Sequence, residues 1–229
     1  MNELQTFWNG LDWSVLTDIL ISVIPALLCI TLHELAHGFV AWRLGDSTAK
    51  NAGRLTLNPL RHLDVLGLLM MVVFKFGWAK PVPVNMRNFR NPKTGMAICA
   101  AAGPLCNLLL GALLLFLYGL LFSPLSDGGT AAQLVLDMAL QAAYLSLALA
   151  VFNVIPIPPL DGSKVLFSFL SDRMYAKLMR YERWGMLLLL ALVALGLTRA
   201  PLAAATLWLF DHLFVLAEAG FRLTQAMFY

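Results

Sequence analysis

Three long apolar runs constrain this chain more than any other feature of its sequence. They cover about Val15 to Leu44, Thr94 to Phe122 and Ala131 to Val154. A helix needs about 20 apolar residues to cross the hydrocarbon core of a bilayer, so each run is long enough to span it. Hydrophobic residues make up 60% of the chain and charged residues only 13%, whereas soluble domains are about 25% charged. The sequence therefore predicts an all-α, multi-pass membrane protein, and it excludes disordered, collagen-like and disulfide-scaffold proteins.

Two further regions accompany these runs. Val65 to Phe76 is apolar but too short to span comfortably, and we expect a re-entrant piece or a short buried helix there. Trp78 to Pro92 contains prolines and alternating residues, which favours an extended strand or a loop. Near the C-terminus, Met186 to Thr198 and Pro201 to Ala219 are apolar. They predict one or two additional helices, either two short spans joined by a turn or one long kinked segment.

The basic residues predict the orientation of the chain. No Lys or Arg precedes Arg43, nine lie between Arg43 and Lys93, none lies in 123–130, and five lie between Lys164 and Arg183. Because short cytoplasmic loops are rich in Lys and Arg, we expect the N-terminus outside and both 43–93 and 161–185 on the cytoplasmic side of the cell membrane. The net charge of +3 is too small to indicate binding to nucleic acid.

The first apolar run contains an HExxH motif, His33-Glu34-Leu35-Ala36-His37. Residues four apart lie on one face of a helix, so both imidazoles can bind one zinc ion. Glu34 lies on the adjoining face, from which it can act as a general base. An alternative is a group of polar residues that line a pore or pack helices. Charged groups at bilayer depth cost about 2.5–3.5 kcal/mol and are normally functional, which favours metal binding.

A catalytic zinc usually has three protein ligands and one open position. The candidates for the third ligand are His62, His212 and Asp161. Asp161 is favoured because it follows the third apolar run, within Asn153-Val154-Ile155-Pro156-Ile157-Pro158-Pro159-Leu160-Asp161-Gly162. The first and third runs both point from outside to inside, so Asp161 and the HExxH motif should reach a similar depth near the cytoplasmic side.

These motifs resemble the site-2 protease family of intramembrane zinc metalloproteases, peptidase family M50. HELAH matches the HExxH of the family and NVIPIPPLDG matches its N-x-x-P-x-x-x-L-D-G signature, while AAGPLCN, GDSTAKNAGRLTLNPLRHLD and FGWAKPVPVN resemble compact bacterial members. The resemblance covers roughly residues 20–170. It implies that His33, His37 and Asp161 bind one zinc ion per chain and that Glu34 is the catalytic base. It also implies that the substrates are transmembrane segments of other proteins in the bilayer.

Other polar residues have weaker claims. Asn107 lies inside the second apolar run and either contacts the site or substrate, or joins helices. Asn153 is a candidate for stabilising the oxyanion or holding the substrate backbone. His62 and Asp64 are expected to cap or pack a helix, to line the entrance, or to hold a second metal. The segment 82–85 is a candidate for pairing with an extended substrate.

The sequence therefore predicts zinc-dependent intramembrane proteolysis in which Glu34 activates a zinc-bound water. The alternative functions are a zinc-dependent transporter or metal sensor without peptidase activity, and an inactive scaffold. We expect one domain over 1–229, with a three-helix catalytic core at about 15–165 and C-terminal helices at about 186–220. The turn at 123–130 has no room for a PDZ insertion, and no CBS domain is expected after residue 185. The oligomeric state is left open.

Overall fold

The computed structural model describes residues 13–64 and 80–228, so the short apolar segment predicted at 65–76 lies outside the described residues. Within these residues the chain is helical and contains no strand. The elements are α2 (Trp13–Arg43), α3 (Thr48–Asn51), η1 (Pro59–Arg61), η2 (Met86–Asn88), α5 (Pro92–Leu125), α6 (Thr130–Val154), α7 (Asp161–Phe167), α8 (Asp172–Arg180), α9 (Glu182–Ala194), α10 (Arg199–Leu213) and α11 (Val215–Phe228).

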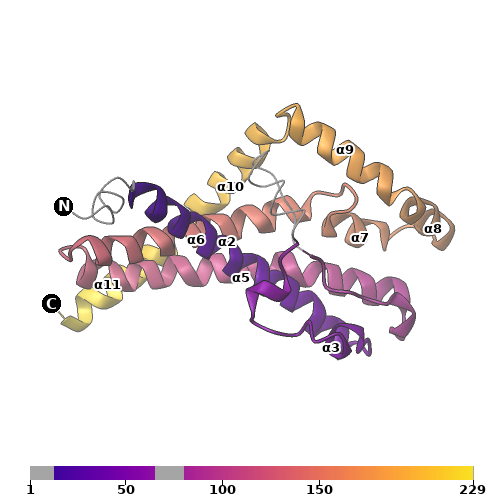
Figure 1. The fold of residues 1–229 in the computed structure, drawn as a ribbon, viewed down its shortest axis with the longest axis horizontal. Helices are drawn as coiled ribbons and strands as arrows, with labels where there is room; N and C mark the ends of the chain where they lie inside the picture. The colour runs from indigo at the N-terminus through magenta and orange to yellow at the C-terminus, as the bar shows by residue number, and fades with distance from the viewer. Residues whose placement is uncertain (1–12, 65–79, 229) are drawn as a thin grey trace, which may run out of the picture.

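Four helical segments among the described residues are long and apolar enough to cross a membrane. They are Ile21–Arg43, Pro92–Leu125, Thr130–Val154 and Arg199–Phe228. The first three confirm the three predicted spans, and the protein is a multi-pass membrane protein. Figure 1 shows α2 and α6 running in the same direction with α5 antiparallel to both, and the start of α2 and the end of α11 at the same end of the bundle.

The C-terminal region has a turn between its two apolar segments. Helix α9 ends at Ala194, and Gly196 has a φ of +73°, a left-handed conformation that favours glycine. Helices α10 and α11 follow and together form one candidate span of 30 residues. A turn therefore separates the two apolar segments, but only the second belongs to a candidate span among the described residues, and its last helix extends to Phe228. In Figure 1, α9 slants away from the other helices before the chain returns through α10.

Helix α5 is the centre of the bundle, and glycines allow its neighbours to approach closely. Four glycines recur every eight residues, and each one packs against a different element. Their positions are Gly95, Gly103, Gly111 and Gly119. Eight residues turn a helix by about 80° beyond two full turns, so the contact face moves around α5 along its length. The partners are Phe89 after η2, the histidines of α2, Leu147 of α6 and Ala217 of α11.

The crossing of α5 and α11 is the closest of these contacts. A Cβ at Gly119 would overlap the backbone carbonyl of Ala217, which cannot move away without shifting α11. Ala217 also belongs to a buried cluster with Leu115, Ala143 and Leu147. Small residues provide this kind of close backbone packing between helices in membranes, where lipid is as apolar as the side chains.

We predict that Gly119→Ser destabilises the protein by about 1–3 kcal/mol, because the added side chain forces α11 away from α5. The matched control is Gly129→Ser at the start of α6, where a Cβ meets nothing within 4 Å. Serine is favoured at that N-cap, so the control should be neutral or stabilising. Thermal unfolding in detergent measures both. Equal midpoints for the two variants would contradict the close crossing.

Candidate metal centre

Three buried side chains form a cluster among the described residues, and each offers one metal-binding atom. Nε2 of His33 lies 3.0 Å from Nε2 of His37. Oδ2 of Asp161 lies 3.2 Å from Nε2 of His33 and 3.1 Å from Nε2 of His37. The structure therefore brings together the two histidines of the HExxH motif and the aspartate favoured as their partner, although 124 residues of sequence separate His37 from Asp161.

Local structure explains how each side chain reaches the cluster. His33 and His37 are four residues apart on α2, so they project from one face. Helix α6 ends at Val154, a proline-rich turn follows, and α7 begins at Asp161. Gly162 allows α7 to fold against the end of α6, since a Cβ there would overlap the carbonyl of Val154. The glycine after Asp161 is thus required for the aspartate to lie beside α2.

The remaining ring nitrogens of both histidines have partners on α5. Nδ1 of His37 lies 2.8 Å from the backbone oxygen of Cys99, to which it can donate. Nδ1 of His33 lies 3.1 Å from Nδ2 of Asn107, whereas the buried Oδ1 of Asn107 has no hydrogen-bond partner among the described residues. Exchanging the two ends of this amide lets Oδ1 accept the N–H of His33. In that arrangement both Nε2 atoms keep a lone pair for a metal.

The spacing of the three atoms fits a zinc ion. Ligand bonds of about 2.0–2.1 Å in a tetrahedral site separate neighbouring ligand atoms by about 3.3 Å. The observed separations of 3.0–3.2 Å are close to this value. Gly103 leaves the side of the cluster that faces α5 free of side chains, since a Cβ there would lie 2.6 Å from Nε2 of His33. The nitrogen and carboxylate donors are those that zinc prefers.

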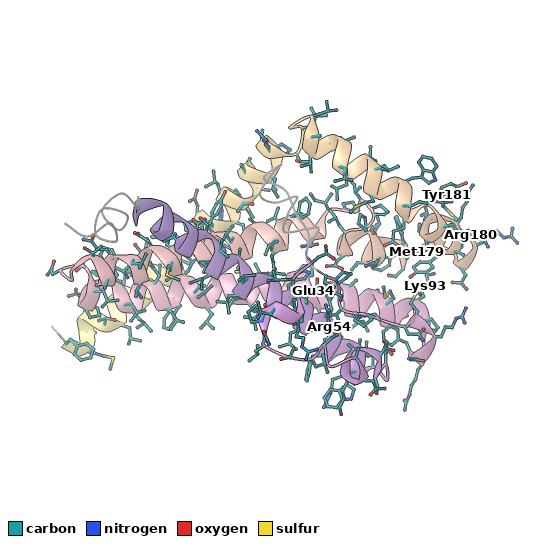
Figure 2. All side chains as sticks on the ribbon, viewed as in Figure 1. Glu34, Arg54, Lys93, Met179, Arg180 and Tyr181 are labelled. Atoms are coloured by element: carbon teal, nitrogen blue, oxygen red, sulfur yellow. The ribbon has the colours of Figure 1, made fainter. Side chains whose placement is uncertain are left out.

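Glu34 lies beside the cluster and contacts a segment far along the chain. Its Oε2 accepts a hydrogen bond of 2.8 Å from the backbone N–H of Val82. Arg54, labelled with Glu34 in Figure 2, donates to the carbonyls of Lys80 and Pro81, which immediately precede Val82. The amide of Val82 is therefore engaged by Glu34 in this structure. Of the strand or loop predicted for this region, the described residues 80–85 form a loop, which η2 (Met86–Asn88) follows.

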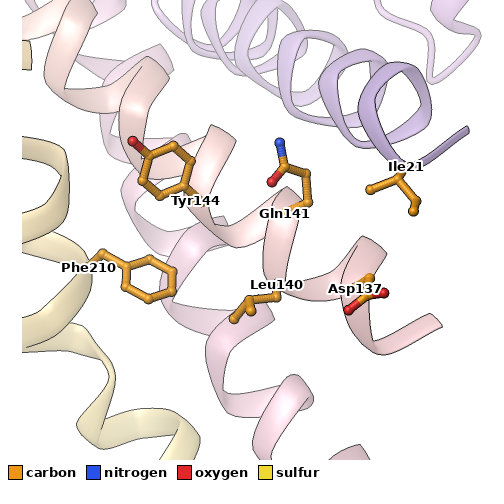
Figure 3. A pocket seen from close by; sticks show the side chains of 6 residues that line it. All are labelled: Ile21, Asp137, Leu140, Gln141, Tyr144 and Phe210. Carbon is orange, nitrogen blue, oxygen red and sulfur yellow. The ribbon is translucent and has the colours of Figure 1, made fainter. Parts of the chain in front are cut away.

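Two cavities lie along the spans. One of about 700 Å³ borders Asp161 and is otherwise apolar, with walls from α5, α6, α7 and α10. Another of about 430 Å³ lies between α2, α6 and α10 (Figure 3) and contains none of the predicted site residues. Its lining residues are Ile21, Asp137, Leu140, Gln141, Tyr144 and Phe210.

The remaining candidates lie outside the cluster. Asn153 donates through Nδ2 to the carbonyl of Leu149 within α6.

His62 is buried and caps η1, and its Nε2 lies 2.9 Å from the carbonyl of Thr56. Asp64, half-buried two residues later, is not in the cluster. His212 is exposed on α10, with Nδ1 close to the carbonyl of Trp208. The two histidines considered as alternatives to Asp161 are therefore elsewhere.

Sequence reasoning missed Asp46, a fully buried carboxylate just after α2. It accepts hydrogen bonds from the backbone and hydroxyl of Thr48, from the backbone N–H of Asn85 and from the side chain of Asn88. Burial raises the pKa of Asp46, but these hydrogen bonds outweigh burial and hold the pKa below its ordinary value of 3.8. The available signal was an acidic residue at the end of an apolar helix, within Gly45-Asp46-Ser47-Thr48.

Spanning helices around a buried His–His–Asp cluster define an integral membrane metalloprotein. The model for peptidase family M50 matches residues 121–196. The chain is 38% identical over 187 residues to "Putative zinc metalloprotease YwhC" of Bacillus subtilis, covering 81% of this chain and 83% of that protein. It is 32% identical over 189 residues to "Putative zinc metalloprotease Rip2" of Mycobacterium tuberculosis, covering 81% and 71%. No solved structure matches the chain significantly.

The chain belongs to peptidase family M50 and is a zinc metalloprotease of the membrane. Zinc is therefore its cofactor, which confirms the predicted family, enzyme class and metal. This assignment favours proteolysis over the alternatives of a transporter, a metal sensor or an inactive scaffold.

The lowered pKa of Asp46 predicts a pH-dependent contribution to stability. Its ionised form is the better acceptor, so its contribution is complete above pH 3.8 and is lost as the pH falls through the lower pKa of the folded state. At pH 7, wild type should unfold at a higher temperature than Asp46→Asn, and the gap should narrow below pH 3.8. Other carboxyl groups are common to both proteins and cancel in the comparison. A gap that stays constant with pH would contradict this role.

Proposed function

We propose that this zinc metalloprotease hydrolyses peptide bonds within the bilayer, in transmembrane segments of other membrane proteins. The observation that carries the proposal is the buried cluster of His33, His37 and Asp161 between spanning helices, with Glu34 beside it. His37 and His33 lie six and ten residues before Arg43, the end of α2, which is roughly 9–15 Å along the helix. Hydrolysis at this position would occur below the membrane surface.

In this proposal His33, His37 and Asp161 hold one zinc ion per chain. Zinc, when bound, polarises the substrate carbonyl and makes water more acidic. The Cys99 carbonyl and Asn107 orient the two imidazoles through their Nδ1 atoms, so that both Nε2 atoms face the ion. Ser146 in turn donates to the backbone carbonyl of Asn107, which supports α5 at this level.

Glu34 carries the proton transfers. Oε2 is held by the amide of Val82, which leaves Oε1 to accept a proton from the attacking water. The same carboxyl then gives the proton to the leaving nitrogen, as the bond between carbonyl carbon and nitrogen breaks. Asn153, at the end of α6, is the proposed donor to the substrate backbone or to the oxyanion. His62 and Asp64 are assigned no role in the chemical step.

The proposed substrate must present an unwound peptide bond, because a helix conceals its carbonyls in internal hydrogen bonds. The apolar cavity that borders Asp161 offers space for aliphatic side chains of such a segment. We propose that the active site lies toward the cytoplasmic side of the cell membrane, with the N-terminus outside, because loops rich in Lys and Arg are usually cytoplasmic. We propose that the four spans act as one domain, whose catalytic core covers about 15–165.

Glu34→Gln tests the proposed base. We expect cleavage of a model single-span protein to fall by about 10²–10⁴-fold, since that is the usual contribution of a general base. Zinc content should stay at the wild-type level because Glu34 is not a proposed ligand. Cleavage in proteoliposomes and metal analysis of the same preparation are the two measurements. A variant that cuts the substrate at the wild-type rate would refute the mechanism.

Asp161→Ala tests the third ligand. We expect this variant to bind zinc weakly or not at all, because only two protein ligands would remain. His62→Ala is the matched control, since its imidazole contacts the carbonyl of Thr56 outside the cluster. Zinc per chain after dialysis against a weak chelator measures both. Zinc loss from His62→Ala with retention in Asp161→Ala would reverse the assignment.

A further inference from the structure

A loop and the short helix η2 lie against the face of α2 that carries Glu34. We call these residues, 80–88, the strap. It begins beside Glu34, and its later residues enter a small core in which Phe89 packs with Ala41 of α2 and Cys99 of α5. Val82 packs against Gly38, one helical turn after Glu34, where a Cβ would lie 3.0 Å from a methyl group of Val82. The strap is therefore fixed at close range to Glu34.

The sequence of the strap leaves one backbone donor at this point. Pro81 and Pro83 have no N–H, so Val82 supplies the only amide proton of these three residues. That N–H donates to Oε2 of Glu34 over 2.8 Å. Because no neighbouring amide can replace it, the orientation of Glu34 depends on where the strap holds Val82.

Arg54 fixes the strap immediately before Val82. This largely buried side chain donates through Nη2 to the carbonyl of Lys80 over 2.6 Å and to that of Pro81 over 3.3 Å. The N–H of Lys80 in turn donates to the backbone carbonyl of His62. Both the N–H and the carbonyl of Lys80 are thus hydrogen-bonded to residues that follow α2 in the chain, His62 and Arg54.

Asp46 fixes the strap on the other side of Val82. Its Oδ2 accepts the backbone N–H of Asn85 over 2.6 Å, and its Oδ1 accepts the Nδ2 of Asn88 over 2.6 Å. The carboxylate is fully buried at the end of α2. It therefore joins the helix that carries Glu34 to the segment that supplies the partner of Glu34.

We propose that Asp46 and Arg54 are positioning residues for catalysis, which hold the strap so that the Val82 amide orients Glu34. The inference rests on the proposed function of Glu34 as the base. Neither residue touches the cluster or the reacting atoms; each acts through the strap. With Oε2 held by Val82, the carboxylate presents a single oxygen to water, and its geometry is set before substrate arrives.

The first test compares Asp46→Asn with Asp172→Asn, a control that neutralises an exposed carboxylate paired with Lys93. Both are reconstituted in phosphatidylethanolamine and phosphatidylglycerol vesicles with a labelled single-span substrate. We expect Asp46→Asn to lower kcat by about tenfold or more, as expected for a misplaced catalytic group, with little change in KM or zinc content. The control should match wild type. An unchanged kcat, or a KM effect alone, would overturn the inference.

A second measurement does not depend on activity. Because its neighbours are prolines, the Val82 amide is the only exchangeable one in 81–83, so hydrogen–deuterium exchange there reports one bond. We expect faster exchange in Asp46→Asn and in Glu34→Ala, and wild-type exchange in Asp172→Asn. Wild-type protection in Asp46→Asn would overturn the inference. Wild-type enzyme that fails to cut any transmembrane substrate, with Val82 protected as expected, would instead refute the proposed function.

If Asp46→Asn does not fold, Val82→Pro and Val82→Ala decide the question. Both remove the valine side chain, but only the proline removes the N–H. We expect kcat for Val82→Pro to be about tenfold or more below that for Val82→Ala. Equal kcat values would show that the amide does not orient Glu34.

Discussion

The metal centre depends on the close approach of α2 and α5 at Gly103. A methyl group at this position would collide with the imidazoles of His33 and His37, so the glycine sets how near the two helices come. The same approach puts the Cys99 carbonyl and the Asn107 amide within hydrogen-bond distance of the two rings. In a bilayer, helices gain little from burying apolar surface against each other, so close packing of this kind largely determines their arrangement.

Polar groups in this apolar interior are arranged in connected pairs. Ser146 of α6 donates to the backbone of Asn107, Asn107 contacts His33, and His33 faces Asp161. An unpaired polar group at bilayer depth costs several kcal/mol, which favours such chains of contacts. They tie α2, α5, α6 and α7 together at one level. The structural scaffold and the metal centre therefore share the same hydrogen bonds.

The sequence predicted the parts of the site that depend on local spacing. The i and i+4 positions of His33 and His37 follow from helix geometry, and the proline-rich turn before Asp161 indicated where the third side chain enters. The contact of Asn107 with His33 was one of two alternatives, because an interior asparagine needs a partner without specifying which. The roles of Asp46 and Arg54 could not be predicted, since their partners lie 26–42 residues away across the strap. Asn153 was placed correctly at the end of α6, yet its amide contacts its own helix.

The alternation of proline and valine in the strap also restricts its alignment. An extended segment can usually slide by one or two residues along its neighbour, because every residue repeats the same donor and acceptor. In Pro81-Val82-Pro83 a slip of one residue in either direction would place a proline opposite Glu34 and leave the carboxylate without a donor. The prolines thus exclude a slip of one residue, and a slip of two residues would break the contacts of Arg54 with Lys80 and of Asp46 with Asn85.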